Sequence, residues 1–316
     1  MYNVGIIGAG QLGSRHLQAL NTSNLPMLIH VADTSEKSLT VAKERYNSLP
    51  KNNNQIVFYE KDLTNLPTTM DFVVVATGSK PRAEIVKYLL THAEVKNLIL
   101  EKVLFPKLNE YDEIGQLLKE KNIKCWVNCP RRMYGMYQDI KNRINTNETI
   151  SMIFQGNNWG LCCNSIHLID IFMYLSDEKK YSITAVDLDN EIIESKRSGY
   201  IEFYGSIMMR TPKGFSLELK CGKKGFDSII IIKNGKNTIE IHEEEGYWKY
   251  NEQIFEYKLP FQSQLTGLLA DMVLKIGYSP LTPFEDSAEY HKPFIASILN
   301  HYNKLQGINS DLCPIT

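Results

Sequence analysis

A glycine cluster near the N-terminus is the first group of residues whose types and spacing indicate chemistry. Residues 8–13 form the pattern G-x-G-x-x-G, directly after a short apolar run and at the start of a helical pattern. In this setting Gly8 permits a tight turn, Gly10 lets the backbone approach a pyrophosphate, and Gly13 lets helix and strand pack closely. The helix N-terminus adds N–H groups and a favourable dipole for phosphates. The predicted dinucleotide-binding residues are Gly8, Gly10, Gln11, Leu12 and Gly13.

An acidic residue indicates which dinucleotide would bind. Asp33 ends the second apolar run and follows Gly13 by about 20 positions, the spacing typical of a ribose-binding carboxylate. A carboxylate there accepts hydrogen bonds from a free 2′-hydroxyl and repels a 2′-phosphate. We therefore predict NAD as the cofactor. NADP remains the alternative, because Thr34, Ser35 and Lys37 offer groups that could contact a phosphate.

The overall charge and the cysteine spacing argue against other kinds of site. The 316 residues include 35 Lys and Arg against 36 Asp and Glu, a formal net charge of −1, so we expect no nucleic-acid partner. The pairs Arg131–Arg132 and Lys223–Lys224 are expected to be ordinary solvated charge. The six cysteines form no CxxC pair, and we predict no metal site.

Neither a membrane nor an exported location is expected. The longest apolar runs, such as Phe72–Ala76 and Ile229–Ile232, are far shorter than the roughly 20 residues of a transmembrane helix. The N-terminus leads directly into a strand-like run without the features of a signal peptide. We therefore expect a cytoplasmic protein with reduced thiols.

The elements that must position the glycine motif alternate between strand and helix patterns. This alternation predicts right-handed βαβ units, and the continuous apolar run Asp71–Ala76 is typical of a central parallel strand. The predicted strands of this half are Val4–Ile7, Met27–Ala32, Val57–Tyr59, Asp71–Ala76, Asn97–Glu101 and Ile123–Asn128. The predicted helices are Gly13–Leu20, Ser35–Tyr46, Arg82–His92 and Tyr111–Lys121.

After about residue 125 the pattern changes, which predicts a second domain. Most of the chain from 183 to 259 is strand-like and is interrupted by turn signals. The fold class expected is α/β: an N-terminal Rossmann domain with a doubly wound parallel sheet over 1–124, and a C-terminal α/β domain with a large, mostly antiparallel open sheet over 125–316. Whether the last helix, about 284–302, packs back on the Rossmann domain stays open. The strands predicted here include Thr149–Gln155, Tyr200–Met209 and Gln253–Lys258, and the helices include Gly135–Ile144, Ser165–Leu175, Ser263–Ile276 and Phe284–Tyr302.

Further stretches extend the pattern beyond the glycine motif. Ala76-Thr77 ends the fourth strand, Glu101-Lys102-Val103 ends the fifth, Gly160–Asp170 opens a helix, and Pro280-Leu281 precedes the last helix. In this order they resemble the Gfo/Idh/MocA family of nicotinamide-dependent oxidoreductases over essentially the whole chain. The resemblance implies a cofactor-binding first domain and a second domain that binds substrate and forms oligomers. It adds four residues to the predicted cofactor contacts, namely Ala76, Thr77, Glu101 and Lys102.

The resemblance also implies two catalytic residues. Lys102 matches the lysine of the family's Glu-Lys-Pro motif, with Val103 in place of proline, and its ammonium would hydrogen-bond the reacting oxygen. His167 matches the histidine of the Asp-x-x-x-His motif and would accept or relay a proton. Cys163 stands where that motif has its aspartate, and a neutral thiol is a weak acceptor. Three alternatives remain: Lys102 and His167 suffice while Cys163 shapes the pocket, Asn164 takes over the aspartate's role, or turnover is lost.

The remaining candidates are predicted to line the substrate cleft. A planar guanidinium at position 132 suits a phosphate or carboxylate, and the indole of Trp159 suits a sugar face. A packing or capping role is the alternative for each, and Arg82, which stands where many family members have a histidine, receives no role. The predicted substrate-binding residues are Asn128, Arg132, Tyr137, Trp159, Cys163 and Asn164.

The function expected is hydride transfer between a nicotinamide and a hydroxyl or carbonyl carbon. The resemblance implies a sugar, sugar nucleotide or related polyol as the substrate, with bacterial surface-sugar biosynthesis as the setting. A nucleotide-binding regulatory or scaffold protein without turnover is the alternative, and Cys163 favours it. Glycoside cleavage through transient oxidation is a third possibility. An open sheet would need cover, so we expect a homodimer or homotetramer.

Overall fold

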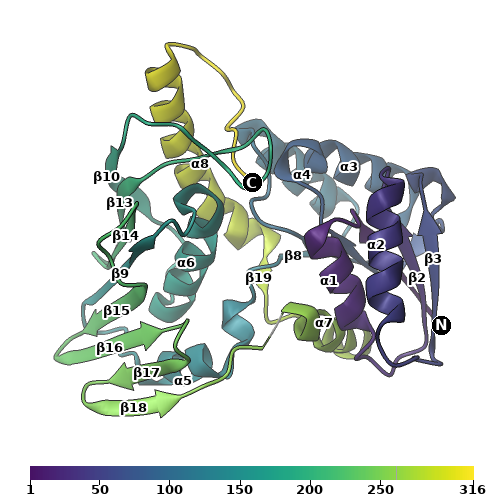
Figure 1. Cartoon of the computed structure of the whole chain (residues 1–316), viewed down its shortest axis with the longest axis horizontal. Helices are drawn as coiled ribbons and strands as arrows, with labels where there is room; N and C mark the ends of the chain where they lie inside the picture. The colour runs from purple at the N-terminus through teal and green to yellow at the C-terminus, as the bar shows by residue number, and fades with distance from the viewer. Residues whose placement is uncertain (261) are drawn as a thin grey trace. The chain divides into compact units, whose positions relative to one another are not determined.

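The chain forms two compact units in the computed structural model, which describes residues 1–260 and 262–316 (Figure 1). Unit one consists of Met1–Phe105, Asn109–Asn128 and Pro260–Phe284, and unit two consists of Pro106–Leu108, Cys129–Leu259 and Glu285–Thr316. Along the sequence, the chain therefore re-enters unit one at Pro260, after most of the residues of unit two. No helix in the part of the chain that the structure describes is both long enough and apolar enough to cross a membrane.

Unit one is built on a seven-stranded sheet whose order is β19-β8-β7-β5-β1-β2-β3. All neighbours are parallel except β19, which pairs antiparallel with β8. The strand order reverses direction between β1 and β5, the point at which open α/β sheets bind ligands beyond the carboxyl ends of their strands. The strands are β1 (Tyr2–Ile7), β2 (Met27–Ala32), β3 (Gln55–Glu60), β5 (Phe72–Val75), β7 (Asn97–Leu100), β8 (Lys124–Val127) and β19 (Thr282–Pro283).

Helices cover this sheet as the doubly wound arrangement requires. Helix α1 packs against α2 and α7, and α3 and α4 lie together on the other side of the sheet (Figure 1). All four side chains of β5 are buried, which explains its continuous apolar sequence. The helices are α1 (Gln11–Leu20), α2 (Glu36–Asn47), α3 (Ser79–His92), α4 (Leu108–Glu120) and α7 (Gln262–Ile276), and the short elements are η1 (Leu63–Asn65), β4 (Thr69–Met70) and β6 (Glu94–Val95).

Unit two is built on an eight-stranded sheet whose order is β10-β13-β14-β9-β15-β16-β17-β18. Every pair is antiparallel except β14 with β9, so the predicted mostly antiparallel sheet is confirmed. The strands are β9 (Ile150–Asn157), β10 (Ser182–Leu188), β13 (Gly205–Arg210), β14 (Ser216–Gly222), β15 (Ile229–Asn234), β16 (Asn237–His242), β17 (Tyr247–Tyr250) and β18 (Gln253–Glu256).

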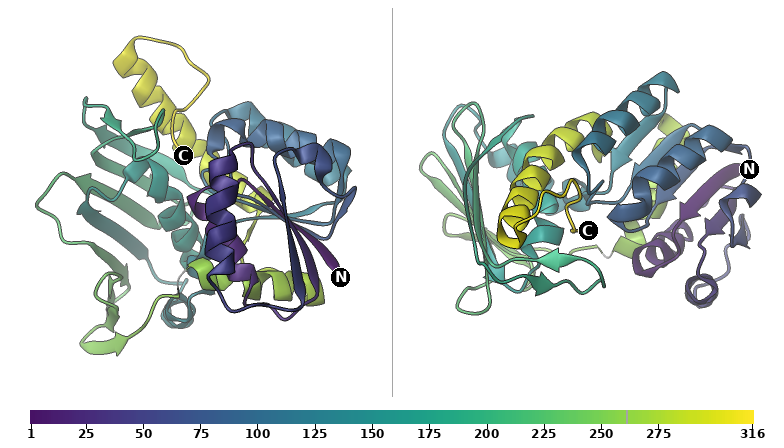
Figure 2. Two further views of the ribbon diagram at one scale, coloured as in Figure 1. Left: turned by 45° about the vertical axis from the view of Figure 1, so that its right-hand side comes forward. Right: turned by 90° about the horizontal axis from the view of Figure 1, so that it is seen from above.

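The helices of unit two lie on one face of this sheet (Figure 2). Along β9 the side chains of Ile150 and Met152 are buried, whereas those of Ser151 and Ile153 on the other face are only partly covered. The helices are α5 (Gly135–Arg143), α6 (Leu161–Ser176) and α8 (Phe284–Gln306), and the short elements are η2 (Pro130–Met133), β11 (Ile193–Glu194) and β12 (Ile201–Glu202).

The strand predicted over Tyr200–Met209 is wrong as a single element, because it is divided into β12 and β13. Gly205, the first residue of β13, has a φ of +121°, and a Cβ atom there would lie 2.2 Å from the carbonyl oxygen of Asp187. Only glycine adopts this conformation without strain at such a close approach. Strand β17 was not predicted, since its flanks at 243–246 carry acidic residues that resemble a loop.

We expect the substitution Gly13→Ala to destabilise the chain. A Cβ atom at Gly13 would lie 1.7 Å from the carbonyl oxygen of Gly8, and the overpacking that results costs about 1–3 kcal/mol or more. Gly10→Ala is the matched control, since within the described residues a Cβ atom there meets nothing within 4 Å. Thermal unfolding should give a lower Tm for Gly13→Ala only. Equal Tm values for the two variants would contradict the close approach.

Candidate functional site

The turn after β1 is shaped to admit a phosphate group. Gly8 has a φ of +93°, and a Cβ atom on it would lie 3.0 Å from the backbone nitrogen of Thr77. The space beside Gly10 is open, and among the described residues no side chain caps this end of α1 and its first turn holds no acidic residue. The helix N-terminus can therefore receive an anion such as a pyrophosphate.

The carboxylate of Asp33 lies at the end of β2 beside this turn. Its Oδ2 accepts a hydrogen bond from the backbone N–H of Ala9 at 2.7 Å, and its Oδ1 accepts one from that of Ser35 at 2.8 Å. These bonds fix the carboxylate at the wall of a cavity of about 680 Å³. Each oxygen has a further lone pair, so the group can still accept hydrogen bonds from ribose hydroxyls.

The cavity beside Asp33 has walls that suit a nucleoside. Apolar groups of Leu63, Pro81 and Ile85 line it together with the ring of Tyr88. Thr77 also lines it, and the Thr77 hydroxyl is buried with no hydrogen-bond partner within the described residues. Buried polar groups are normally paired, so a polar atom of a ligand would complete this site. The residues present therefore fit NAD, with the glycine turn at its phosphates and Asp33 at its ribose.

A buried carboxylate precedes Lys102 at the end of β7. The Glu101 Oε1 atom lies 2.8 Å from His16 Nε2 and 2.6 Å from Asn128 Nδ2, while His16 Nδ1 lies 2.8 Å from the hydroxyl of Thr266. Burial opposes ionisation, but the His16 and Asn128 hydrogen bonds hold the pKa of the Glu101 carboxyl below its usual range. This network fixes the backbone that presents Lys102. The predicted contacts of Glu101 and Asn128 with cofactor and substrate stay predictions.

Arg82 connects two turns of the cofactor-binding unit. Its guanidinium is fully buried and donates hydrogen bonds to the carbonyl oxygens of Thr77, Val103 and Leu104, the last at 2.9 Å. The turn after β5 is thereby held to the turn that follows Lys102. No role was predicted for Arg82, and nothing in the local sequence indicates which carbonyl groups it meets.

In unit two, the first turns of α6 carry three of the predicted site residues. Cys163 and Asn164 precede His167 by four and three positions, so each of them neighbours His167 on the surface of the helix. The carboxylate of Glu202, from β12, accepts hydrogen bonds from the backbone N–H groups of Cys162 at 2.6 Å and Cys163 at 3.1 Å. Burial raises the pKa of the Glu202 carboxyl. A carboxylate therefore lies at the N-terminus of α6, and Glu202 supplies it instead of residue 163.

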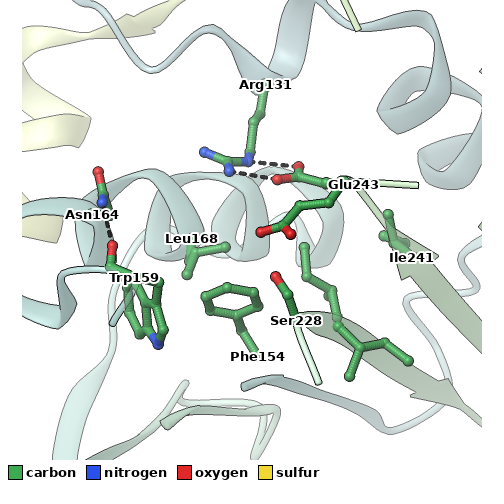
Figure 3. Close-up of a pocket in the computed structure, with 11 residues that line it drawn as sticks. Arg131, Phe154, Trp159, Asn164, Leu168, Ser228, Ile241 and Glu243 are labelled. Atoms are coloured by element: carbon green, nitrogen blue, oxygen red, sulfur yellow. Dashed lines mark hydrogen bonds and ion pairs between the residues drawn. The ribbon is translucent and has the colours of Figure 1, made fainter. Parts of the chain in front are cut away.

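A pocket of about 250 Å³ lies beside α6 in unit two (Figure 3). The rings of Phe154 and Trp159 meet edge to face at 4.8 Å, and Asn164 Nδ2 donates to the backbone oxygen of Trp159 at 2.6 Å. Two of the predicted substrate-binding residues, Trp159 and Asn164, are thus brought together. The pocket is lined by Arg131, Phe154, Trp159, Asn164, Leu168, Ser228, Ile229, Ile230, Ile241, Glu243 and Glu244.

An ion pair forms one side of this pocket. Arg131 Nε and Nη2 donate to the two oxygens of Glu243 at 3.0 and 2.8 Å (Figure 3). The Tyr137 hydroxyl also donates to Glu243 Oε1, at 2.7 Å. Burial opposes ionisation of Glu243, but the guanidinium of Arg131 holds the pKa of this carboxyl below its usual range. Tyr137 was predicted to bind substrate. Its ring is fully buried, and its hydroxyl is hydrogen-bonded to Glu243.

The expectation that Arg131–Arg132 is ordinary solvated charge is wrong. Arg132 Nε donates to Asp170 Oδ2 at 2.8 Å, and the carboxylate of Asp170 is almost completely buried. Both guanidinium groups are therefore neutralised by carboxylates from distant parts of the sequence. Residues 131 and 243 are 112 positions apart, so their pairing depends on the tertiary fold and leaves no signal in the local sequence.

The predicted site residues thus fall into two groups. The glycine motif, Asp33, Thr77 and Lys102 belong to unit one, and His167, Trp159 and Asn164 belong to unit two. No group of three or more His, Cys, Asp or Glu side chains suited to a metal ion occurs within the described ranges.

Comparison with known proteins agrees with the geometry of unit one. The family described as an oxidoreductase family with an NAD-binding Rossmann fold, Gfo/Idh/MocA, matches residues 2–129. No curated protein gave a significant match.

Solved structures resemble the chain over almost its whole length. A super-repressor mutant of Gal80p from Saccharomyces cerevisiae has a TM-score of 0.74 at 16% identity, covering 97% of this chain and 96% of its own. The apo scyllo-inositol dehydrogenase from Lactobacillus casei has a TM-score of 0.68 at 17% identity and covers 96% of both chains. The UDP-N-acetylglucosamine 3-dehydrogenase GnnA from Acidithiobacillus ferrooxidans has a TM-score of 0.69 at 11% identity and covers 97% of both.

At these identities the solved structures establish the fold, and the family model adds the cofactor. The family match covers the Rossmann fold of residues 2–129, which is similar to that of the Gfo/Idh/MocA family of NAD-binding oxidoreductases.

Proposed function

We propose that this protein is a dehydrogenase or reductase that acts on a hydroxyl or carbonyl carbon of a sugar or related polyol. The observation that carries the proposal is the cradle in unit one, where the Gly8 turn and Asp33 border an open cavity of about 680 Å³. The pocket of unit two adds an aromatic wall and polar groups, a combination that suits a polyhydroxylated ring. The scyllo-inositol dehydrogenase likeness agrees with this substrate class.

In this proposal, Lys102 and His167 handle the proton that accompanies the reaction. NAD, when bound, supplies the hydride acceptor. The ammonium of Lys102 hydrogen-bonds the reacting oxygen and stabilises its alkoxide character, while the imidazole of His167 accepts the hydroxyl proton. The Glu101 network and the bonds of Arg82 hold the backbone around Lys102, so they position the lysine without touching the substrate.

A sugar nucleotide remains within the proposed substrate class. The UDP-N-acetylglucosamine 3-dehydrogenase likeness supports it at the level of the fold. A role in bacterial surface-sugar biosynthesis is the setting that corresponds to this alternative. The six cysteines are free thiols, which suits the cytoplasm.

The second candidate function is nucleotide-dependent regulation without turnover. Cys163 favours it, because a neutral thiol replaces the carboxylate of the catalytic motif that the chain otherwise resembles. The Gal80p structure, whose relative from Kluyveromyces lactis is described as a transcriptional regulator, shares the fold. Binding of NAD without turnover of any polyol would favour this candidate.

The substitution Lys102→Met should abolish turnover and leave NAD affinity nearly unchanged. The loss of the group that binds the reacting oxygen is expected to lower kcat by about 10²–10⁴-fold. Lys121→Met, at an exposed lysine of the same unit, is the control. Absorbance of the reduced cofactor gives kcat, and quenching of protein fluorescence gives the Kd of NAD. Retained turnover in Lys102→Met would remove this lysine from the mechanism.

Asp33→Ala should weaken NAD more than NADP. The carboxylate accepts hydrogen bonds from the free ribose hydroxyls, and charged hydrogen bonds of this kind contribute about 1.5–3 kcal/mol. The ratio of the two Kd values is the measurement, because the lost bond to Ala9 affects both cofactors alike. Tighter binding of NADP than of NAD to the unmodified protein would contradict the cofactor assignment.

We also propose that the protein is a homodimer or homotetramer. On the sheet of unit two, Val186 and Met208 are each 39% exposed, and Ile153 and Ile231 are partly exposed. Apolar side chains of this kind on an open sheet are suited to an interface. Light scattering on the purified protein should give a mass two or four times that of the chain, and a monomer at micromolar concentration would contradict the proposal.

A further inference from the structure

The pocket of unit two has the size and walls for one sugar ring. Its volume of about 250 Å³ falls just below the roughly 300–1,000 Å³ of pockets that hold drug-sized ligands. Phe154 and Trp159 form an aromatic wall, and Leu168 adds an aliphatic surface from α6 (Figure 3). The ring of a monosaccharide, with its apolar C–H face and its peripheral hydroxyls, matches this combination.

More acidic than basic side chains line this pocket. Arg131 is the one cationic residue that lines it among the residues the structure describes, and two of its nitrogens are directed to Glu243. Glu244 also lines the pocket, and it is exposed. One guanidinium therefore faces two carboxylates, and its planar fork is already occupied by one of them.

This arrangement disfavours a negatively charged substituent on the ring. A carboxylate or phosphate on the ligand would have to displace Glu243 from Arg131, which would leave this part-buried carboxylate without its cationic partner and with the Tyr137 hydroxyl as its one remaining hydrogen-bond donor among the described residues. It would also approach Glu244, and like charges repel strongly where solvent is partly excluded. Hydroxyl groups meet no such obstacle, since carboxylate oxygens and the Asn164 amide accept or donate hydrogen bonds to them.

We propose that this pocket binds an uncharged polyol or sugar ring, and that the Arg131–Glu243 pair is the specificity element that excludes sugar acids and sugar phosphates. This proposal rests on the proposed function, because it names the substrate class of the same reaction. Glu243 acts here by occupying the guanidinium that would otherwise attract an anion. Its removal should therefore change which ring is bound, as well as how tightly.

The test compares glucose with glucuronate, which differ only in the group at C6. Isothermal titration of the full chain, saturated with NAD, should show that glucose binds about tenfold or more tightly than glucuronate. In Glu243→Gln, Arg131 is released from its charged partner, and the order should reverse in favour of glucuronate. The double variant Arg131→Met with Glu243→Gln should lose the gained affinity for glucuronate, because the cation that receives the carboxylate is gone.

Two further variants provide a control and a substitute in case Glu243→Gln does not fold. Glu240→Gln is the matched control. Glu240 lies in β16, just before Glu243 in the sequence, and it pairs with Lys249 and does not line the pocket. If Glu243→Gln fails to fold, as judged by its Tm, Glu244→Gln at the exposed rim should still raise glucuronate affinity a few-fold. Equal or tighter binding of glucuronate by the unmodified protein, or no change of preference in either variant, would overturn the proposal.

The outcomes separate this proposal from the proposed function. Turnover of glucuronate with NAD would overturn the specificity assigned to the pair and leave the dehydrogenase proposal standing. Preferential binding of glucose without turnover of any polyol would support the pocket and overturn the dehydrogenase proposal.

Discussion

The contact between Gly13 and the carbonyl oxygen of Gly8 is the constraint on which the cofactor site depends. Because a Cβ atom at position 13 would lie 1.7 Å from that oxygen, only glycine allows α1 to start so close to the end of β1. This close approach aims the N-terminus of α1 at the point where the strand order of the sheet reverses. The carboxylate of Asp33 is hydrogen-bonded to the same turn through Ala9, so the turn proposed to hold the phosphates and the carboxylate proposed to hold the ribose are fixed together.

A buried carboxylate and a part-buried one organise the residues around the two candidate sites. Glu101 is held by His16 and Asn128, and Glu243 is held by Arg131 and Tyr137. Each carboxylate thus has at least two hydrogen-bonding partners, and removing one of them would leave a charged group less well satisfied where solvent is largely excluded. These carboxylates therefore support the residues beside them, such as Lys102 after Glu101, for which we propose a role in the reaction. The same principle makes Arg131 unavailable to an anionic ligand.

The sequence predicts the Rossmann half well because its signals are local. Strand Met27–Ala32 is found with the predicted bounds, and the glycine motif and Asp33 lie around one turn, since a buried parallel strand is a continuous apolar run and a phosphate turn needs glycines. The charged partners could not be predicted. Glu202 reaches the N-terminus of α6 from β12, and Glu243 reaches Arg131 across 112 positions, because strands of an antiparallel sheet bring together residues that no local pattern relates.

We propose that this NAD-binding protein transfers hydride between the nicotinamide and a carbinol carbon of an uncharged polyol. Transfer of an isotopic label tests it most directly: the protein is incubated with NAD and polyols that carry deuterium on their carbinol carbons, and the cofactor is then analysed by mass spectrometry. If hydride is transferred as proposed, deuterium from at least one neutral polyol should appear in the reduced cofactor. Binding of NAD with no label transferred from any member of a broad panel would contradict it.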